Sequence, residues 1–161
     1  MTTTTSAHRA TKTAASQDAI TLLKADHAKV SGLFEEYAKA RSTAKKKTLV
    51  AEICTELTVH AQIEEEIFYP EVKAALKDHL LVPEATVEHA SLKDLIAQIE
   101  TGEPGGEMFD AKVKVLAEYV KHHVKEEQNE MFPKVKKSSL DLLELGSRMA
   151  DRKADLVAMR G

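Results

Sequence analysis

HAQIEEEIFYP, at residues 60–70, recurs 63 positions later as HVKEEQNEMFP, at residues 123–133. Both stretches begin with a histidine, carry a glutamate four residues after it and end in proline. On a helix, residues i and i+4 lie on one face with their Cβ atoms about 6 Å apart. The similarity extends outward, because the whole of residues 18–77 can be laid over residues 80–137. The sequence therefore predicts a duplicated helical unit whose two copies bring equivalent side chains to one central site.

Helical periodicity covers most of the chain. From Asp18 onward, apolar residues recur at alternating steps of three and four, which is typical of helices with one buried face. After the helix that begins at Asp18, we expect helices over about 44–77, 84–100, 107–137 and 139–158, with Pro70 and Pro133 kinking the second and fourth or ending their regular part. The predicted fold is all-α: an antiparallel up-down-up-down four-helix bundle with an extra C-terminal helix. The expected domains are a disordered Thr/Ser/Ala-rich tail at 1–17, the bundle at 18–137 and a capping helix at 138–161.

Composition and charge exclude several classes of function. The 161 residues include 23 Lys or Arg and 26 Asp or Glu, for a net charge of -3, so we expect no nucleic-acid partner. The apolar runs are only a few residues long, against about 20 needed to cross a bilayer, so we expect no membrane span. A single cysteine, Cys54, cannot form an internal disulfide and fits the cytoplasm. The tail is basic and contains no acidic residue, so a targeting segment is the alternative interpretation.

Four histidines occupy the apolar faces of the expected helices: His27, His60, His89 and His123. A single such histidine is commonly a core residue bonded to a backbone carbonyl. Four of them, two with glutamate at i+4, would bury several unpaired ionisable groups, which is costly without a ligand. A pair of cations removes that cost, with Glu64 and Glu127 as bridges between the ions. Imidazole and carboxylate without thiolate suit iron, manganese or zinc.

Four motifs carry a family resemblance: LLKADH at 22–27, HAQIEEEIFYP at 60–70, VEH at 87–89 and HHVKEEQNEMFP at 122–133. In these the sequence resembles the hemerythrin-like, HHE cation-binding family, over about residues 20–135. The resemblance implies a four-helix bundle with two iron ions in a non-haem centre, often oxo- or hydroxo-bridged, that binds dioxygen or reacts with peroxide or nitric oxide. It assigns as terminal ligands His27, His60, His89 and His123, and as bridges Glu64 and Glu127.

The chain departs from the oxygen-carrying hemerythrins at two places. Those proteins have a further histidine one turn after the third-helix histidine, where this chain has Lys93. Fewer terminal ligands leave open metal positions, which favours inner-sphere reaction of a small oxidant over reversible carriage. They also space the last histidine and acid by five, whereas His123 and Glu127 are four apart. His122 would restore the spacing of five and stays an alternative ligand.

Three further side chains are candidates for contact with the metals or their ligands. Glu56 and Tyr119 lie one turn before His60 and His123, at equivalent places in the repeat. Glu126 is a spare ligand beside Glu127.

Two functions from different classes follow from the sequence. The first is a di-iron protein that binds or consumes dioxygen, peroxide or nitric oxide, with a catalase-like or oxidase-like reaction as its activity. The second is an iron-storage or oxygen- and redox-sensing protein without turnover. We expect a monomer or a homodimer.

Overall fold

The computed structural model describes residues 17–160 and is all-helical over that range, with no strand there, as the sequence predicted. The predicted tail at residues 1–17 falls almost entirely outside these residues. The elements are α1 (Ala19–Lys39), α2 (Thr43–Ile63), η1 (Glu64–Phe68), α3 (Tyr69–Leu76), α4 (Leu81–Glu100), α5 (Glu107–Glu126), η2 (Glu127–Met131), α6 (Phe132–Lys136) and α7 (Leu142–Arg160). The segments η1 and η2 are π-helical.

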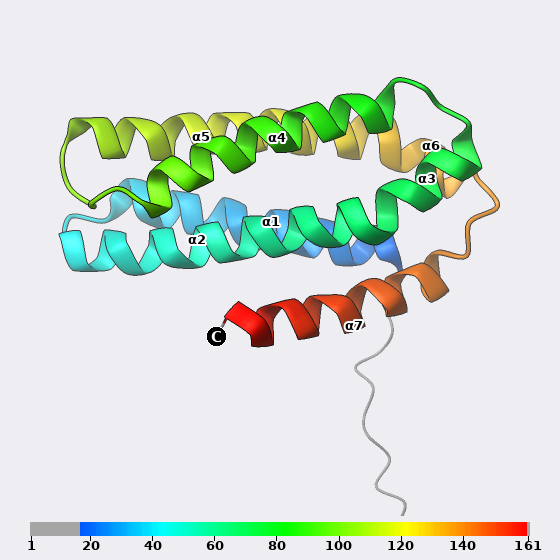
Figure 1. The fold of residues 1–161 in the computed structure, drawn as a ribbon, viewed down its shortest axis with the longest axis horizontal. Helices are drawn as coiled ribbons and strands as arrows, with labels where there is room; N and C mark the ends of the chain where they lie inside the picture. Colours follow the sequence, from blue (N-terminus) through cyan, green and yellow to red (C-terminus); the bar gives the residue numbers. More distant parts are fainter. Residues whose placement is uncertain (1–16, 161) are drawn as a thin grey trace, which may run out of the picture.

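The long helices α1, α2, α4 and α5 run side by side, and the chain reverses direction after α1, after α3 and after α4 (Figure 1). The C-terminal helix α7 lies along α1 and α2, on the side of the molecule away from α4 and α5 (Figure 1). None of the helices described here is both long and apolar enough for a bilayer crossing. The two repeated units are thus stacked on each other, and α7 packs mainly on the first of them, through α1 and α2.

The helix ends have identifiable causes. Asp18 caps α1, because its side chain accepts a hydrogen bond from the backbone N–H of Thr21 at 2.8 Å, and Ser42 caps α2 in the same way through Lys45 at 3.1 Å. Between α4 and α5, Gly105 and Gly106 have φ angles of 103° and 99°, which residues with a Cβ rarely adopt. These short connections make consecutive helices antiparallel neighbours.

The helices that carry the repeated motif continue past their glutamates as π-helix. In η1 the N–H of Tyr69 donates to the carbonyl of Glu64, five residues earlier, and in η2 that of Phe132 donates to Glu127. The regular part of each helix therefore ends before the proline that follows. Each proline lies in the first turn of the next helix, where a missing N–H costs least. The α3 segment leaves the axis of α2 at an angle (Figure 1).

The interior consists of two apolar clusters with a polar layer between them. One cluster fills the end of the molecule near the α1–α2 and α4–α5 turns, and the other packs η1, α3, η2 and α6 against α7. On α1, His27 follows Leu23 of the second cluster and precedes Val30 of the first. The buried polar side chains are Asp26, His60, Glu64, His89, His123 and Glu127. Apolar packing on both sides thus encloses the ionisable groups.

Cys54 lies in the first apolar cluster and is 1% exposed. Its burial raises the pKa of its thiol to about 12. Because the thiolate is the reactive form, we expect the native protein to react with an aromatic disulfide reagent about a hundredfold or more slower than the unfolded chain. Absorbance of the released thiolate, with and without denaturant at pH 8, measures both rates. Equal rates would show that this end of the molecule opens readily.

Candidate metal centre

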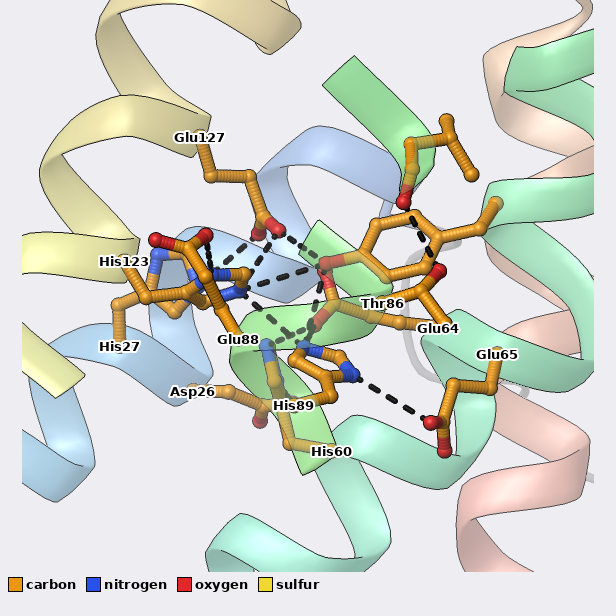
Figure 2. Close-up of polar contacts among 12 residues, drawn as sticks. Asp26, His27, His60, Glu64, Glu65, Thr86, Glu88, His89, His123 and Glu127 are labelled. Carbon is orange, nitrogen blue, oxygen red and sulfur yellow. Dashed lines mark hydrogen bonds and ion pairs between the residues drawn. The ribbon is translucent and has the colours of Figure 1, made fainter. Parts of the chain in front are cut away.

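Six side chains from six different elements meet at one level of the molecule. Figure 2 shows them pointing toward one another from α1, α2, η1, α4, α5 and η2. The imidazole rings of the first two histidines have centroids 4.9 Å apart, and those of the last two 4.8 Å. The side chains are His27, His60, Glu64, His89, His123 and Glu127, the set that the sequence predicted as metal ligands.

Each of the two glutamates lies between histidines of different halves of the repeat. Glu64 Oε1 is 3.1 Å from His60 Nε2 and 3.3 Å from His89 Nε2. Glu127 is 3.3 Å from the Nε2 atoms of both His27 and His123. A carboxylate that bridges two cations requires such a position, with one oxygen available to each side.

The outer nitrogens of three of the four histidines are hydrogen-bonded to acceptors, which orients these rings. An ionised carboxylate can only accept a hydrogen bond, so the facing Nδ1 carries a proton and Nε2 points to the centre. This pattern is common around metal-bound histidines. The acceptors are Asp26 for His60 at 2.9 Å, Glu88 for His123 at 2.9 Å and Gln128 for His27 at 2.8 Å, with Glu65 3.7 Å from His89.

Opposite charges hold the cluster together in the absence of a cation. Burial opposes the ionisation of Glu64, but His60 and His89 outweigh it and lower the pKa of the carboxyl well below its ordinary value. Burial also opposes the charge on His60, yet the charge of Glu64 and the hydrogen bond to Asp26 raise its pKa well above the ordinary value. Burial also opposes the charge on His123, but the hydrogen bond and the charge of Glu127 outweigh it and raise the pKa of His123 to about 9. A cation would take the place of these protons.

The donor set fits two cations. Nearly all buried polar atoms in proteins have a hydrogen-bond partner, yet several in this cluster have none. The unpaired atoms are His27 Nε2, His60 Nε2, both carboxylate oxygens of Glu64, His89 Nδ1 and Glu127 Oε1. Two triplets each have ligand atoms within 4.8 Å of one another: His27, His60 and Glu127, and Glu64, His89 and His123. Each triplet takes both histidines from one half of the repeat and a glutamate from the other, so the two sites are interlocked.

Tyr69 also reaches the centre, which the sequence analysis did not predict. Its hydroxyl donates to Glu127 Oε2 at 2.6 Å and lies 3.2 Å from His89 Nε2. Burial, with the charges of Glu64 and Glu127, raises the pKa of Tyr69 well above its ordinary value, so it stays a phenol. On an α-helix, Tyr69 would lie about 140° around the axis from Glu64. The π turn brings it back to the same side.

A sequence signal for this residue exists in the repeat. Both motifs place an aromatic residue directly before the proline, Tyr69 in the first copy and Phe132 in the second. Phe132 stacks on His27, with ring centroids 6.1 Å apart and an interplanar angle of 5°. The hydroxyl at position 69 is therefore a difference between two otherwise equivalent halves.

Replacing Tyr69 by Phe tests how much its hydroxyl contributes. The change leaves Glu127 Oε2 without its donor at nearly constant volume, so we expect the metal-free protein to lose about 1–3 kcal/mol of unfolding free energy. Chemical denaturation followed by circular dichroism measures this loss. Tyr119→Phe is the matched control, because that ring is half-exposed and its change should leave stability unaltered. Equal stability of the two variants would contradict the role assigned to the hydroxyl.

The C-terminal helix reaches the centre through Asp26. Lys153 of α7 donates to Asp26 Oδ1, while the other oxygen of Asp26 accepts from His60 Nδ1. Burial raises the pKa of Asp26, but His60 and Lys153 outweigh burial and lower it. The LLKADH motif contains Asp26, but the sequence does not show that residue 153 would meet it. A link thus runs from α7 to a histidine of the cluster.

The structure does not bring the remaining candidates of α2 and α4 to the centre. Glu56, a candidate for contact with the metals or their ligands, instead accepts a hydrogen bond from Lys29 of α1 at 2.8 Å. This cationic partner keeps Glu56 out of the central cluster. Lys93, at the place of the missing fifth histidine, points to Glu65, with Nζ 2.6 Å from a carboxylate oxygen.

On α5 the buried face includes Val120 and His123, which turns their neighbours outward. Tyr119 is 50% exposed and is not in the cluster, so the expectation that it reaches the metals or their ligands is not met. The side chain of His122 is 66% exposed and pairs with Glu126 at 3.0 Å. The structure thus brings His123, and not His122, into the central cluster, and it leaves Glu126 outside.

The chain is similar in sequence to known proteins. A DNA nickase of Nostoc sp. is 30% identical over 115 residues, which are 71% of this chain but only 32% of the nickase. The uncharacterized protein Rv2633c of Mycobacterium tuberculosis is 26% identical over 139 residues, 84% of each chain.

A solved structure is also similar. The crystal structure of a hemerythrin HHE cation binding domain-containing protein from Mycobacterium kansasii, a homolog of Rv2633c, is 27% identical and superposes with a TM-score of 0.74 over 87% of each chain. The family of the hemerythrin HHE cation binding domain matches residues 18–135. These residues include all six side chains of the central cluster. The chain belongs to the hemerythrin HHE cation-binding family.

Proposed function

We propose that this protein is a non-haem di-iron protein that binds and reacts with a small diatomic oxidant. In this proposal the helices form an up-down-up-down bundle with α7 added to it, and the six clustered side chains hold two iron ions. The observation that carries the proposal is the interlocking of the two triplets, in which each glutamate faces one histidine of each half. Such an arrangement is suited to a pair of ions and not to one.

The donor atoms suit iron, manganese or zinc. Of these, zinc has no redox change to offer to an oxidant, and we propose iron. Iron bound here would supply electron transfer and an open position for a small ligand. The chain's own residues orient the ligands, since Asp26 and Glu88 each hold the Nδ1–H of a histidine.

A small cavity beside the cluster limits the size of the ligand. Its volume is about 30 Å³, and it borders the histidines on the side of the first apolar cluster. Since about 10–15 Å³ holds one water molecule, the cavity admits a molecule of two or three heavy atoms. Its apolar lining consists mainly of Val30, Leu57, Leu92, Ile96, Val120 and Val124. Dioxygen and nitric oxide fit such a lining better than peroxide, which needs hydrogen-bond partners.

Tyr69 is the proton-bearing group nearest to the ligands. It is 3% exposed and stays protonated, and its hydroxyl donates to Glu127. In the proposed function it holds Glu127 in place and keeps a proton within reach of the centre without admitting water. The surrounding apolar side chains exclude bulk solvent, which strengthens these electrostatic contacts.

The test is metal content followed by ligand reactivity. Protein purified without added metal should contain two iron ions per chain, and its visible spectrum should change on exposure to dioxygen or nitric oxide. Oxygen evolution from hydrogen peroxide, measured with an oxygen electrode, decides whether peroxide is also turned over. A protein that takes up no iron, or takes up one ion, would contradict the proposal.

A sensing role without turnover is a second candidate, favoured by the link from α7. Lys153 and Asp26 connect α7 directly to His60, so a change at the metal alters a contact of the C-terminal helix. Hydrogen exchange of α7 distinguishes the sensing role. We expect it to change with bound metal in a protein that turns over none of dioxygen, nitric oxide and peroxide.

A further inference from the structure

A second group of ligand-type side chains lies outside the central cluster, on the α4–α5 face. His122 Nε2 is 3.0 Å from Glu126 Oε1 and 3.6 Å from Glu88 Oε2. Glu84 lies beside Glu126, which raises the pKa of the Glu84 carboxyl, so a third carboxyl group is at the same place. We call Glu84, Glu88, His122 and Glu126 the outer cluster. Ligand atoms of Glu88, His122 and Glu126 all lie within 4.8 Å of one another.

The outer cluster touches the centre directly. Glu88 belongs to both groups, because its Oε1 accepts from His123 Nδ1 at 2.9 Å while its Oε2 faces His122. A cavity of about 10 Å³ lies between Glu84, Glu88 and Glu126 on the outside and His123 and Glu127 on the inside. Glu127 is 2% exposed, and its Oε1, which has no hydrogen-bond partner, lies 3.3 Å from His27 Nε2 in the central cluster. The cavity has room for about one particle the size of a water molecule.

The outer cluster lacks the cationic partner that the equivalent position in the first half of the repeat has. Glu88 is the equivalent of Asp26, since each holds the Nδ1 of a histidine in its own half. Asp26 is neutralised by the ammonium group of Lys153. Among residues 17–160, no lysine or arginine forms an ion pair with any member of the outer cluster. The three carboxyl groups of this cluster therefore have no cationic partner of that kind.

The two halves also differ in what covers them. The equivalents of His122 and Glu126 in the first half are Val59 and Ile63, both buried in the apolar cluster that includes α7. Within the part of the chain that the structure describes, no helix covers the second half at this place, and the side chain of His122 is 66% exposed. The outer cluster is therefore open to an exchangeable cation, at the position equivalent to the one Lys153 occupies in the first half.

We propose that the outer cluster is a cation site at which ferrous iron or another divalent ion binds before it passes the cavity beside Glu127 and enters the central cluster. The inference rests on the proposed di-iron function. Clustered carboxylates raise the local concentration of cations and so speed their capture, an effect that salt screens. Because Glu88 contacts both groups, an ion can exchange one side chain at a time.

The experiment compares metal uptake by metal-free full-length protein. Cobalt(II), whose visible absorption reports its coordination, is mixed in a stopped-flow instrument with the wild type and with the double variant H122Q/E126Q. We expect uptake by the double variant to be about tenfold slower at low salt, with the difference shrinking at high salt. We also expect the final number of tightly bound ions to be unchanged, and a weaker additional ion to be lost in an equilibrium titration.

Glu118→Gln is the matched control for the change in charge. Glu118 is an exposed acid on the same helix, and its loss should leave the uptake rate near that of the wild type. Wild-type uptake by H122Q/E126Q, or equal slowing by Glu118→Gln, would overturn the inference and leave the central site intact. A loss of tightly bound ions from the double variant would also overturn it, since these residues would then be ligands of the centre. Absence of tight binding in the wild type would instead refute the proposed di-iron function.

Discussion

Glu64→Gln is expected to reduce the iron content from two ions per chain to less than one. Glu64 is fully buried and lies 3.1 Å and 3.3 Å from histidines of different halves, so both ions of the proposed centre would share its carboxylate. Gln keeps the volume but removes the charge and one anionic oxygen. Even changes to residues that only orient a ligand weaken metal affinity by about 10–100-fold, so loss of a shared ligand should exceed that. Elemental analysis of protein purified without added metal measures the content.

The control for this variant is Glu130→Gln. Glu130 lies in η2, the equivalent π turn of the second half, but it is exposed, so the same chemical change there should leave two ions bound. Circular dichroism shows that both variants are helical before the comparison is made. A Glu64→Gln protein that retained two ions would refute the bridging role of this residue, whatever its activity.

Gly146→Ala is expected to destabilise the protein by about 1–3 kcal/mol, because it forces α7 away from α1. Gly146 is buried at the start of α7, against the chain that leads into α1. A Cβ at this position would lie 2.8 Å from the backbone nitrogen of Ala19 and closer still to the carbonyl oxygen of Gln17. Backbone atoms cannot turn aside as a flexible side chain can. Thermal unfolding of the metal-free protein measures the loss as a lower Tm.

Gly32→Ala supplies the opposite result in the same protein. Gly32 lies in the middle of α1 and a Cβ there would meet nothing within 4 Å, so alanine should stabilise the helix by about 0.5–1 kcal/mol. The two substitutions are chemically identical and differ only in the space around them. Equal effects at both positions would mean that α7 is not packed on α1 as described.

The position of α7 matters beyond stability. The same helix carries Lys153, which neutralises Asp26 beside His60. A displaced α7 would leave Asp26 buried with one fewer cationic partner, so Gly146→Ala is also expected to weaken metal binding in the first half. In the second half, no lysine or arginine among residues 17–160 pairs with Glu88, the equivalent of Asp26.

Much of the candidate site could be predicted from the sequence. The duplicated motif and the apolar periodicity select one face of each helix, and that face carries the six side chains that the structure brings together. The same reasoning proposed Glu56 and Tyr119 for contact with the metals or their ligands, and neither lies in the central cluster. One turn along a helix keeps two residues on the same face only approximately. At the edge of a buried stripe, a partner such as Lys29 decides whether a side chain turns inward.

The all-helical class, the duplication and the six side chains of the central cluster were determined by local spacing, since a helix converts sequence intervals into positions on one face. Tyr69, Lys153 and the outer cluster depended on tertiary structure. A π turn changes the angular relation between Glu64 and Tyr69, and Lys153 meets Asp26 only because α7 packs back on α1. Contacts between residues more than a hundred positions apart in the sequence depend on which helix faces become buried together. The spacing of residues within one helix does not determine which faces these are.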